Sequence, residues 1–213
     1  ARLVVAARGP EGIGLFLVDA TQLKIKPYRM LDETGAADIA LRGTQAEPLG
    51  LGQEAIEDAV DFGTALICAE AVGAMKSACD ATLEYLKTRK QFGVPIGAFQ
   101  ALQHRMVDMF IAQEQARSMA CLACSKVDSS RDAKERARAV SAAKIRIADA
   151  ARHISQEAVQ LHGGMGMSEE LKISHTFRRL TMMNRLTKTR AIATGSPSRV
   201  GSWLTSISGR AST

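Results

Sequence analysis

The sequence is dominated by apolar residues that recur every three or four positions from residue 53 to about residue 161. This spacing puts them on one face of an amphipathic helix, and a chain with several such faces buries them by packing the helices together. Aromatic residues make up only 4% of the chain, whereas alanine and methionine are frequent and both are good helix formers. These features together predict a mainly α-helical protein.

Clusters of glycine, proline and serine divide this region into four segments. Gly93, Pro95 and Gly97 end the first segment, and the Gly163-Gly164 pair ends the third. Ser168, followed by two glutamates, predicts the N-cap of a shorter fourth helix. The predicted helices span about 53–89, 99–127, 132–161 and 168–186. Three long helices and a shorter one indicate an antiparallel four-helix bundle.

The periodicity also predicts which side chains form the core of the bundle. In the third helix the inward positions are Val140, Ile147, Ala151, Ile154, Ala158 and Leu161. In the second helix they are Leu102, Met106, Met109, Phe110 and Gln113.

The first 50 residues have a different pattern. Two β-rich runs at 3–5 and 15–18 flank a Gly-Pro-Glu-Gly turn at 9–12, which predicts a hairpin, and a third run at 38–43 is a further candidate strand. Two or three strands cannot form a stable sheet alone. We therefore expect their partners in further sequence or in another chain.

The net charge of +6 is concentrated at the C-terminal end. Residues 171–213 contain eight Lys and Arg and no Asp or Glu, so residues 1–170 carry a net charge of −2. The helical period is lost after residue 186, and we expect an irregular or disordered tail over 187–213. A helical bundle whose basic tail binds nucleic acid is one hypothesis, but scattered cations and a single Trp203 favour it little.

The four cysteines lack the density of a disulfide framework, which favours a reducing, cytoplasmic environment. Cys121 and Cys124 form a C-x-x-C without a second pair, so we expect core residues and no metal site. No segment has the length of an apolar membrane span.

Two stretches carry residue types suited to binding a ligand. Arg89-Lys90-Gln91-Phe92-Gly93 lies at the predicted exit of the first helix, and an arginine there can bind a phosphate in a bidentate manner. On this stretch alone, cations that complement a helix dipole are the favoured explanation.

The second stretch is Gln160-Leu161-His162-Gly163-Gly164 at the exit of the third helix. The bare backbone of Gly163 and Gly164 would let a ligand approach, and Gln160 offers an amide. An ordinary joint between two helices explains the same spacing, and His162 is better explained as a packed or capping histidine than as a base.

Taken in order, RKQFG (89–93), FQALQHRMVDM (99–109), AVQLHGGMGM (158–167) and SEEL (168–171) resemble the acyl-CoA dehydrogenase family. The resemblance covers about residues 1–186. GLFLVDA and AADIALRG, within residues 1–50, are similar to the last strands of the family's middle β-domain, and 51–186 to its C-terminal four-helix bundle. The HGGMGMSEE and HTFRRL stretches look most like the small or partner subunits of heteromeric members, such as pimeloyl-CoA and steroid side-chain acyl-CoA dehydrogenases.

The resemblance implies an FAD cofactor, an acyl-CoA substrate and an oligomer built through the bundle. In such enzymes a glutamate removes the α-proton of the thioester and the β-hydride goes to the flavin N5. Arg89, Gln91 and Phe92 would meet the FAD of a neighbouring subunit. Phe99 and Gln100 would line its adenosine. The residues implied near its pyrophosphate are Gln160, Gly163 and Gly164.

The sequence departs from the family pattern at the catalytic base. The two positions at which family members carry the glutamate correspond to Thr187 and Gly63, and neither residue can remove a proton. Either a partner subunit supplies the base and this chain is a scaffold, or the sequence after Arg185 is not native. The family's N-terminal helical domain and most of its β-domain are also absent from the sequence. We therefore predict a partial subunit that neither holds FAD tightly nor turns over acyl-CoA alone.

Overall fold

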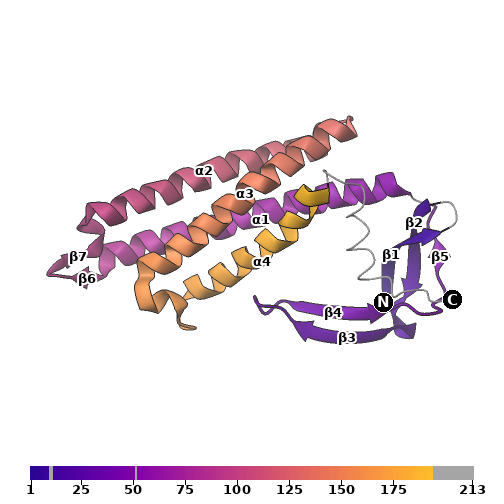
Figure 1. Ribbon diagram of the computed structural model, residues 1–213, viewed down its shortest axis with the longest axis horizontal. Coiled ribbons are helices and arrows are strands. Elements are labelled where there is room, and N and C mark those ends of the chain that lie inside the picture. Colours follow the sequence, from indigo (N-terminus) through magenta and orange to yellow (C-terminus); the bar gives the residue numbers. More distant parts are fainter. Residues whose placement is uncertain (10–11, 51, 194–213) are drawn as a thin grey trace. The chain divides into compact units, whose positions relative to one another are not determined.

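The structure is a computed structural model that describes residues 1–9, 12–50 and 52–193, with side chains described up to Asn184 apart from Gln22 (Figure 1). The chain divides into two compact units, and among the described residues they comprise 1–60 with 192–193, and 61–191. The second unit contains most of the helical sequence, and the first contains the larger strands.

Four helices make up most of the second unit. They are α1 (Gln53–Thr88), α2 (Gln100–Ser129), α3 (Ala133–His162) and α4 (Lys172–Ala193). Successive helices run in opposite directions (Figure 1). This confirms the predicted bundle, with helix boundaries close to those expected for the first three helices.

Cross-helix contacts fix the register of the bundle. Asp61 bonds to Arg136 near the start of α1 and α3, and Tyr85 stacks on His162 near their ends, so these two helices run parallel. Glu70 bonds to Arg179, and Asn184 bonds back to Ala148 of α3 although α4 begins just after the end of α3, so α4 runs antiparallel to both α3 and α1. The short connections between helices require this alternation of direction.

The core consists of small and flexible side chains. Alanines alternate with a few larger residues, such as Met75, Met109 and Ile154, each of which has no measurable exposure. Small residues let helices approach closely, and burial of each larger side chain contributes about 1.5–3 kcal/mol. All six predicted core positions of α3 are buried. In α2 the predicted Met109 and Gln113 are buried, but the prediction for Phe110 is wrong, because it is 57% exposed and the helix buries Ala112 and Ala116 instead.

The two ends of α3 are capped as the sequence indicates. The Asp132 carboxylate accepts a hydrogen bond of 2.8 Å from the Lys134 N–H. At the other end Gly163 adopts φ 61°, a conformation that favours glycine.

The predicted start and end of the fourth helix are wrong. Ser168 does not cap it, because its hydroxyl donates back to the Met165 carbonyl at 3.0 Å and α4 begins only at Lys172. The helix then continues to Ala193, beyond the expected boundary at 186. The rest of the predicted tail, 194–213, lies outside the described residues.

The first unit contains two small antiparallel sheets. The elements are β1 (Arg2–Gly9), β2 (Gly12–Asp19), β3 (Lys24–Arg29), β4 (Gly35–Ala40) and β5 (Glu47–Pro48). Strands β1 and β2 pair from Arg2↔Asp19 to Gly9↔Gly12, which confirms the predicted hairpin. The run at 38–43 is confirmed in part as β4.

Strand β3 was not predicted from the sequence. It pairs with β4, from Lys24↔Ala40 to Arg29↔Gly35, and all its residues are exposed. Pro27 and the basic residues around it give no alternating pattern, and proline is tolerated only in edge strands. Among the described residues, no helix is long and apolar enough to cross a membrane.

Candidate functional site

A tight hairpin follows the exit of α1. Strand β6 (Lys90–Gln91) pairs with β7 (Val94–Pro95), and Phe92-Gly93 form the two-residue loop with φ of 55° and 82°. Two positive φ angles are those of a type I′ turn, which matches the twist of a hairpin. Phe92 is therefore held in a conformation that is costly for a residue with a Cβ, and its ring is 91% exposed.

The hairpin is tied to the end of α1. The Arg89 N–H donates to the Tyr85 carbonyl (2.9 Å), and the Ile96 N–H donates to the Arg89 carbonyl (2.8 Å). A Cβ on Gly97 would lie 3.0 Å from the Leu86 carbonyl oxygen, so this segment packs directly on the α1 backbone. The position of Arg89 thus follows from the last turn of α1.

A glycine-rich turn follows the exit of α3. The segment η3 (Gly163–Met167) folds back on the helix, and a Cβ on Gly166 would lie 2.4 Å from the Val159 carbonyl oxygen. Added Cβ atoms on Gly163 and Gly164 would meet nothing within 4 Å. The backbone of these two residues faces open space, as ligand approach requires.

One aromatic contact joins the C-terminal ends of α1 and α3. The rings of Tyr85 and His162 stack with centroids 4.3 Å apart and an angle of 26°. His162 is buried, and its Nδ1 lies 2.8 Å from the Ala158 carbonyl oxygen, which can only accept, so Nδ1 carries the proton. Its burial confirms the prediction of a packed His162. Since Arg89 and Gly163 lie just beyond these rings, both exits lie at one end of the bundle (Figure 1).

The predicted ligand-binding residues are all exposed at this end. They are Arg89, Gln91, Phe92, Phe99, Gln100, Gln160, Gly163 and Gly164. The Phe92 and Phe99 rings meet edge to face with centroids 6.2 Å apart. Together these residues offer a guanidinium, three amides, bare backbone and two aromatic rings, a set that suits a large anionic ligand with flat rings.

The two positions expected for a catalytic base carry none. Gly63 is half-buried on α1, and a Cβ there would meet nothing within 4 Å. Thr187 lies within the helical span of α4. Because Arg179 of α4 bonds to Glu70 of the antiparallel α1, the equal rise of the two helices places residue 187 near residue 62. The two positions, Gly63 and Thr187, therefore lie at about the same height along the bundle axis.

The nearby carboxylates of α1 are engaged in ion pairs. Asp61 is buried and accepts from the Arg136 Nε at 3.2 Å. Glu70 accepts from the Arg179 Nη2 at 2.6 Å. Both carboxylates face guanidinium groups, and neither residue stands at a position that corresponds to the family's glutamate.

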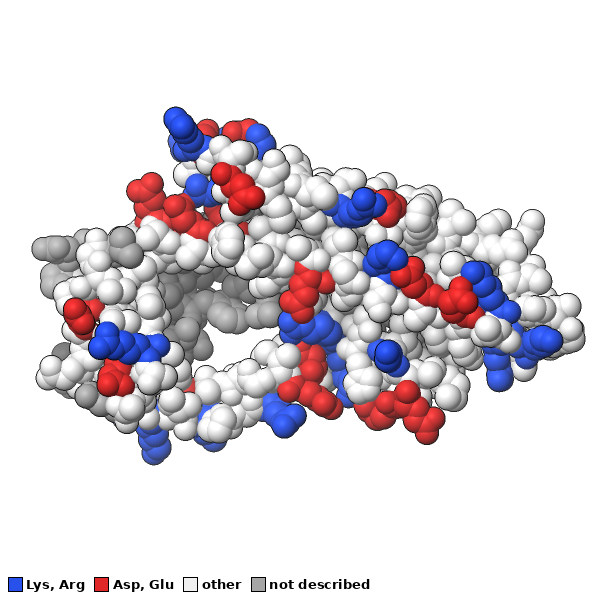
Figure 2. Space-filling view, turned by 180° about the vertical axis from the view of Figure 1, so that it is seen from behind, with Lys and Arg blue, Asp and Glu red and all other residues white. Residues whose placement is uncertain are grey.

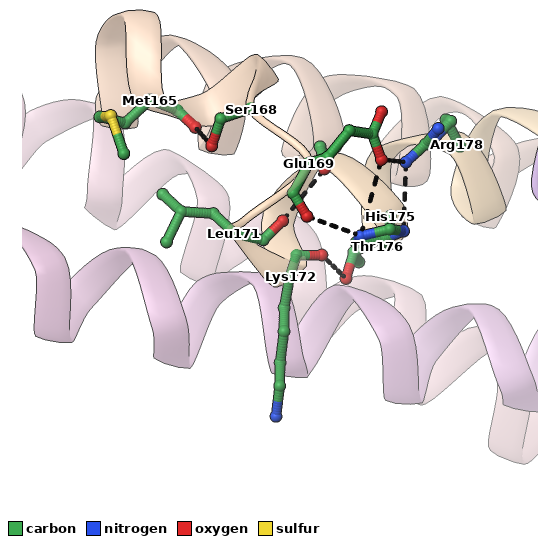
Figure 3. A network of polar contacts seen from close by, with 9 residues as sticks. Met165, Ser168, Glu169, Leu171, Lys172, His175, Thr176 and Arg178 are labelled. Atoms are coloured by element: carbon green, nitrogen blue, oxygen red, sulfur yellow. Dashed lines mark hydrogen bonds and ion pairs between the residues drawn. The ribbon is translucent and has the colours of Figure 1, made fainter.

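A polar network fixes the connection between α3 and α4 (Figure 3). The Arg178 Nη2 donates to Glu169 at 2.6 Å and lies 3.1 Å from the His175 Nδ1. The His175 Nε2 lies 3.1 Å from the Glu169 carbonyl oxygen. The hydrogen bond that the Glu169 carboxylate accepts from Arg178 lowers the pKa of this carboxyl. The network holds Glu169 in the connection and explains why α4 begins later than predicted.

The cysteines are unequal in burial. Burial raises the pKa of the Cys68 and Cys79 thiols to about 11. Cys121 is exposed, so its predicted place in the core is wrong, whereas Cys124 packs partly against the core. Among the residues that the structure describes, no group of three or more His, Cys, Asp or Glu is arranged to hold a metal ion.

Comparison with known proteins adds an independent observation. The family model "Acyl-CoA dehydrogenase, C-terminal domain" matches residues 50–193, about two thirds of the chain. The chain belongs to the acyl-CoA dehydrogenase family. The match includes the whole four-helix bundle, and this membership confirms the resemblance found in the sequence motifs.

Individual acyl-CoA dehydrogenases and related structures agree with this assignment. The chain is 31% identical over 183 residues to acyl-CoA dehydrogenase IpdE2 of Mycobacterium tuberculosis (strain ATCC 25618 / H37Rv), covering 84% of the chain and 51% of that protein. The structure "Tcur3481-Tcur3483 steroid ACAD G363A variant" matches with a TM-score of 0.78 and 30% identity, covering 92% of this chain and 56% of that one. The structure "FAD complex of PigA" matches with a TM-score of 0.77 and 25% identity, covering 91% and 55%. The chain thus spans about half the length of these relatives.

Three residues that pack against the candidate site without lining it were not recognised from the acyl-CoA dehydrogenase motifs. Tyr85, Gly97 and Gly166 act through contacts with residues elsewhere in the fold. The third glycine of HGGMG is a signal for close packing at Gly166. Tyr85 has no comparable signal, because its partner lies on another helix.

Proposed function

We propose that this chain is part of an FAD-dependent acyl-CoA dehydrogenase subunit, and that the shared end of α1 and α3 binds the FAD diphosphate. The observation that carries the proposal is the Tyr85–His162 stack, which brings the Arg89 hairpin and the Gly163–Gly164 turn to one end of the bundle. The structure whose title names an FAD complex, and which shares this fold at 25% identity, also supports it.

The residues of this end fit the parts of FAD by their chemistry. Arg89 supplies a guanidinium for a diphosphate oxygen, and the Gly163–Gly164 backbone admits that group without a steric clash. Gln91 and Gln160 supply amides beside it. Phe92 and Phe99, with Gln100, would meet the adenosine of the FAD. Bound FAD would accept a hydride from the β-carbon of an acyl-CoA thioester.

The exposure of Phe92 favours a site shared between subunits. An aromatic ring that is 91% exposed, on a backbone with positive φ, gains little from its own chain. Such a side chain is typical of a contact with another molecule. We therefore assign Arg89, Gln91 and Phe92 to the FAD of a neighbouring subunit.

Assembly is proposed to use exposed apolar positions of the helices. On α2 the residues Val107, Phe110, Ile111 and Leu122 are each more than 40% exposed. Exposed apolar side chains on one helix are stabilised when another subunit covers them. A homo- or hetero-oligomer through the bundle is therefore part of the proposal.

The proton-removing base is assigned to another subunit or to sequence outside this chain. Gly63 and Thr187 carry no base, and the Asp61 and Glu70 carboxylates are ion-paired. A scaffold subunit that completes a partner's FAD site is accordingly the second candidate function. We predict that the chain alone does not turn over acyl-CoA; the cytoplasmic location inferred from its cysteines also stays a prediction.

Nucleic-acid binding receives no support from the described part of the bundle. On the face drawn in Figure 2, acidic and basic side chains lie next to one another. Several cations, including Arg105, Lys126 and Arg179, are paired with carboxylates. A nucleic-acid surface would instead gather unpaired cations on one face.

FAD titration with matched variants tests the proposal. Arg89→Ala should weaken FAD binding by about tenfold or more, because a charge-assisted bond contributes about 1.5–3 kcal/mol. Lys87→Ala removes the same charge from the same helix end, where Lys87 pairs with Glu84, and should leave FAD binding nearly unchanged. Equal weakening in both variants would indicate nonspecific attraction. No FAD binding by the chain or by its assembled complex would contradict the proposal.

A further inference from the structure

We propose that Tyr85 and His162 are a positioning pair, whose stack fixes the Arg89 hairpin against the Gly163–Gly164 turn. The inference rests on the proposed flavin site and adds the two residues that hold the Arg89 hairpin and the Gly163–Gly164 turn at a fixed separation. Neither ring needs to touch the ligand. The consequence is that binding of an anionic dinucleotide depends on a contact behind the site.

On the α1 side, the hairpin is a continuation of the turn that carries Tyr85. The Tyr85 carbonyl accepts from the Arg89 N–H at 2.9 Å, and the Arg89 carbonyl accepts from the Ile96 N–H at 2.8 Å. Gly97 then packs against Leu86, with only 3.0 Å between an added Cβ and the Leu86 oxygen. A shift of the Tyr85 turn would therefore carry the hairpin with it.

On the α3 side, the glycine turn is attached to the residue that carries the other ring. His162 directly precedes Gly163, and its Nδ1–H donates to the Ala158 carbonyl at 2.8 Å, which fixes the ring on the helix. Gly166 packs against this end, with an added Cβ 3.1 Å from the His162 Cβ and 2.4 Å from the Val159 oxygen. The backbone of 163–167 is thus held around His162.

The hairpin that follows α1 and the glycine turn that follows α3 are joined by the stacked rings of Tyr85 and His162, whose centroids are 4.3 Å apart. Two flat rings at an angle of 26° fix both the separation and the rotation of the helix ends, which an aliphatic contact does not. A diphosphate that bonds to Arg89 on one side and to the glycine backbone on the other requires that separation to be constant. The flat shape of the ring at 162 is therefore the property under test, and His162→Phe keeps it.

The first experiment compares the FAD affinities of assembled complexes that contain either the wild-type chain or one of its variants. His162→Ala should weaken FAD binding by about tenfold, the factor that corresponds to the loss of one stacked pair. His162→Phe should stay within about threefold of the wild type, because a phenyl ring restores the stack. The control His153→Ala removes an exposed histidine of the same helix and should have no effect. Wild-type affinity in His162→Ala would overturn the positioning role, and so would a Phe variant as weak as the Ala variant.

The second experiment needs no ligand. Amide hydrogen exchange over 89–97 should become faster in His162→Ala and remain as in the wild type in His162→Phe, although the substituted residue lies on another helix. Tyr85→Leu, which keeps an apolar side chain without a ring, should likewise speed exchange over 163–167, and it serves if His162→Ala does not fold. Absence of FAD binding by the wild type would remove the proposed flavin site, and the exchange rates would still decide the pair. Unchanged exchange across the stack in the folded variants would overturn it.

Discussion

Three backbone positions at the bundle end illustrate three different physical demands. Gly163 needs a positive φ to end α3, Gly166 needs the absence of a Cβ, and Phe92 tolerates a positive φ with a Cβ. Gly163 and Gly166 are glycines, which suit their positions. Phe92 does not suit a positive φ, and a locally unfavourable residue in an exposed turn is typical of a functional position.

At Gly166 the demand is steric. Gly166→Ala should lower the free energy of unfolding by about 1–3 kcal/mol, because its Cβ would lie 2.4 Å from the Val159 oxygen and the backbone must shift. Gly164→Ala is the matched control, since a Cβ there meets nothing within 4 Å, and should change stability by less than about 0.5 kcal/mol. Urea denaturation of both variants measures the difference. Equal stabilities would contradict the close contact.

At Phe92 the demand is conformational. With φ at 55°, Phe92→Gly should be more stable to urea than Phe92→Ala by about 1 kcal/mol, because only the glycine adopts this region without strain. Both variants lose the ring, so its contact with Phe99 cancels in the comparison. An Ala variant as stable as the Gly variant would show that the backbone at 92 is not strained.

At the scale of elements, the connection between α3 and α4 depends on side-chain bonds more than on helix propensity. Glu169, Arg178 and His175 hold the residues before Lys172 out of the helix (Figure 3). The bond to Arg178 makes the pKa of Glu169 lower in the folded chain than in the unfolded chain. The bond therefore stabilises the connection above the ordinary glutamate pKa, and this stabilisation is lost as the pH falls through the lowered value.

The prediction for this connection is a change in titration. In Arg178→Gln the pKa of Glu169 should rise toward the ordinary value of about 4.3, as measured by carbon NMR of the carboxyl group. Lys172→Gln is the control, because the Lys172 side chain points away from Glu169 (Figure 3) and its removal should leave the titration unchanged. An unaltered Glu169 titration in Arg178→Gln would show that the ion pair does not form in solution.

How well each element could be predicted follows from its dependence on distant contacts. α3 has a wide apolar stripe, and its six core positions were predicted correctly. α2 buries small alanines, so Phe110 was misplaced. Strand β3 is recognisable only by its pairing with β4. In the candidate site the motifs indicated Arg89 and the glycine turn, whereas the Tyr85–His162 contact, which joins distant parts of the sequence, has no local signature.

At the scale of the whole molecule, the closed bundle protects its interior thiols. Cys68 and Cys79 are buried, and burial raises their pKa values to about 11, so the reactive thiolate form is scarce near neutral pH. We predict that iodoacetamide labels the exposed Cys121 first and labels Cys68 and Cys79 only after unfolding in urea, as followed by mass spectrometry. Labelling of either buried thiol at the rate of Cys121 would show that the bundle opens readily.

The whole chain spans about half of its relatives, and its bundle end presents residues suited to a ligand that other sequence must help to hold. The most direct test is a crystal structure of the assembled enzyme with FAD bound. We predict that the Arg89 guanidinium and the Gly163–Gly164 backbone contact the FAD diphosphate, with the Tyr85–His162 stack intact behind them. FAD bound elsewhere, with this end of the bundle facing only solvent, would contradict the proposed function.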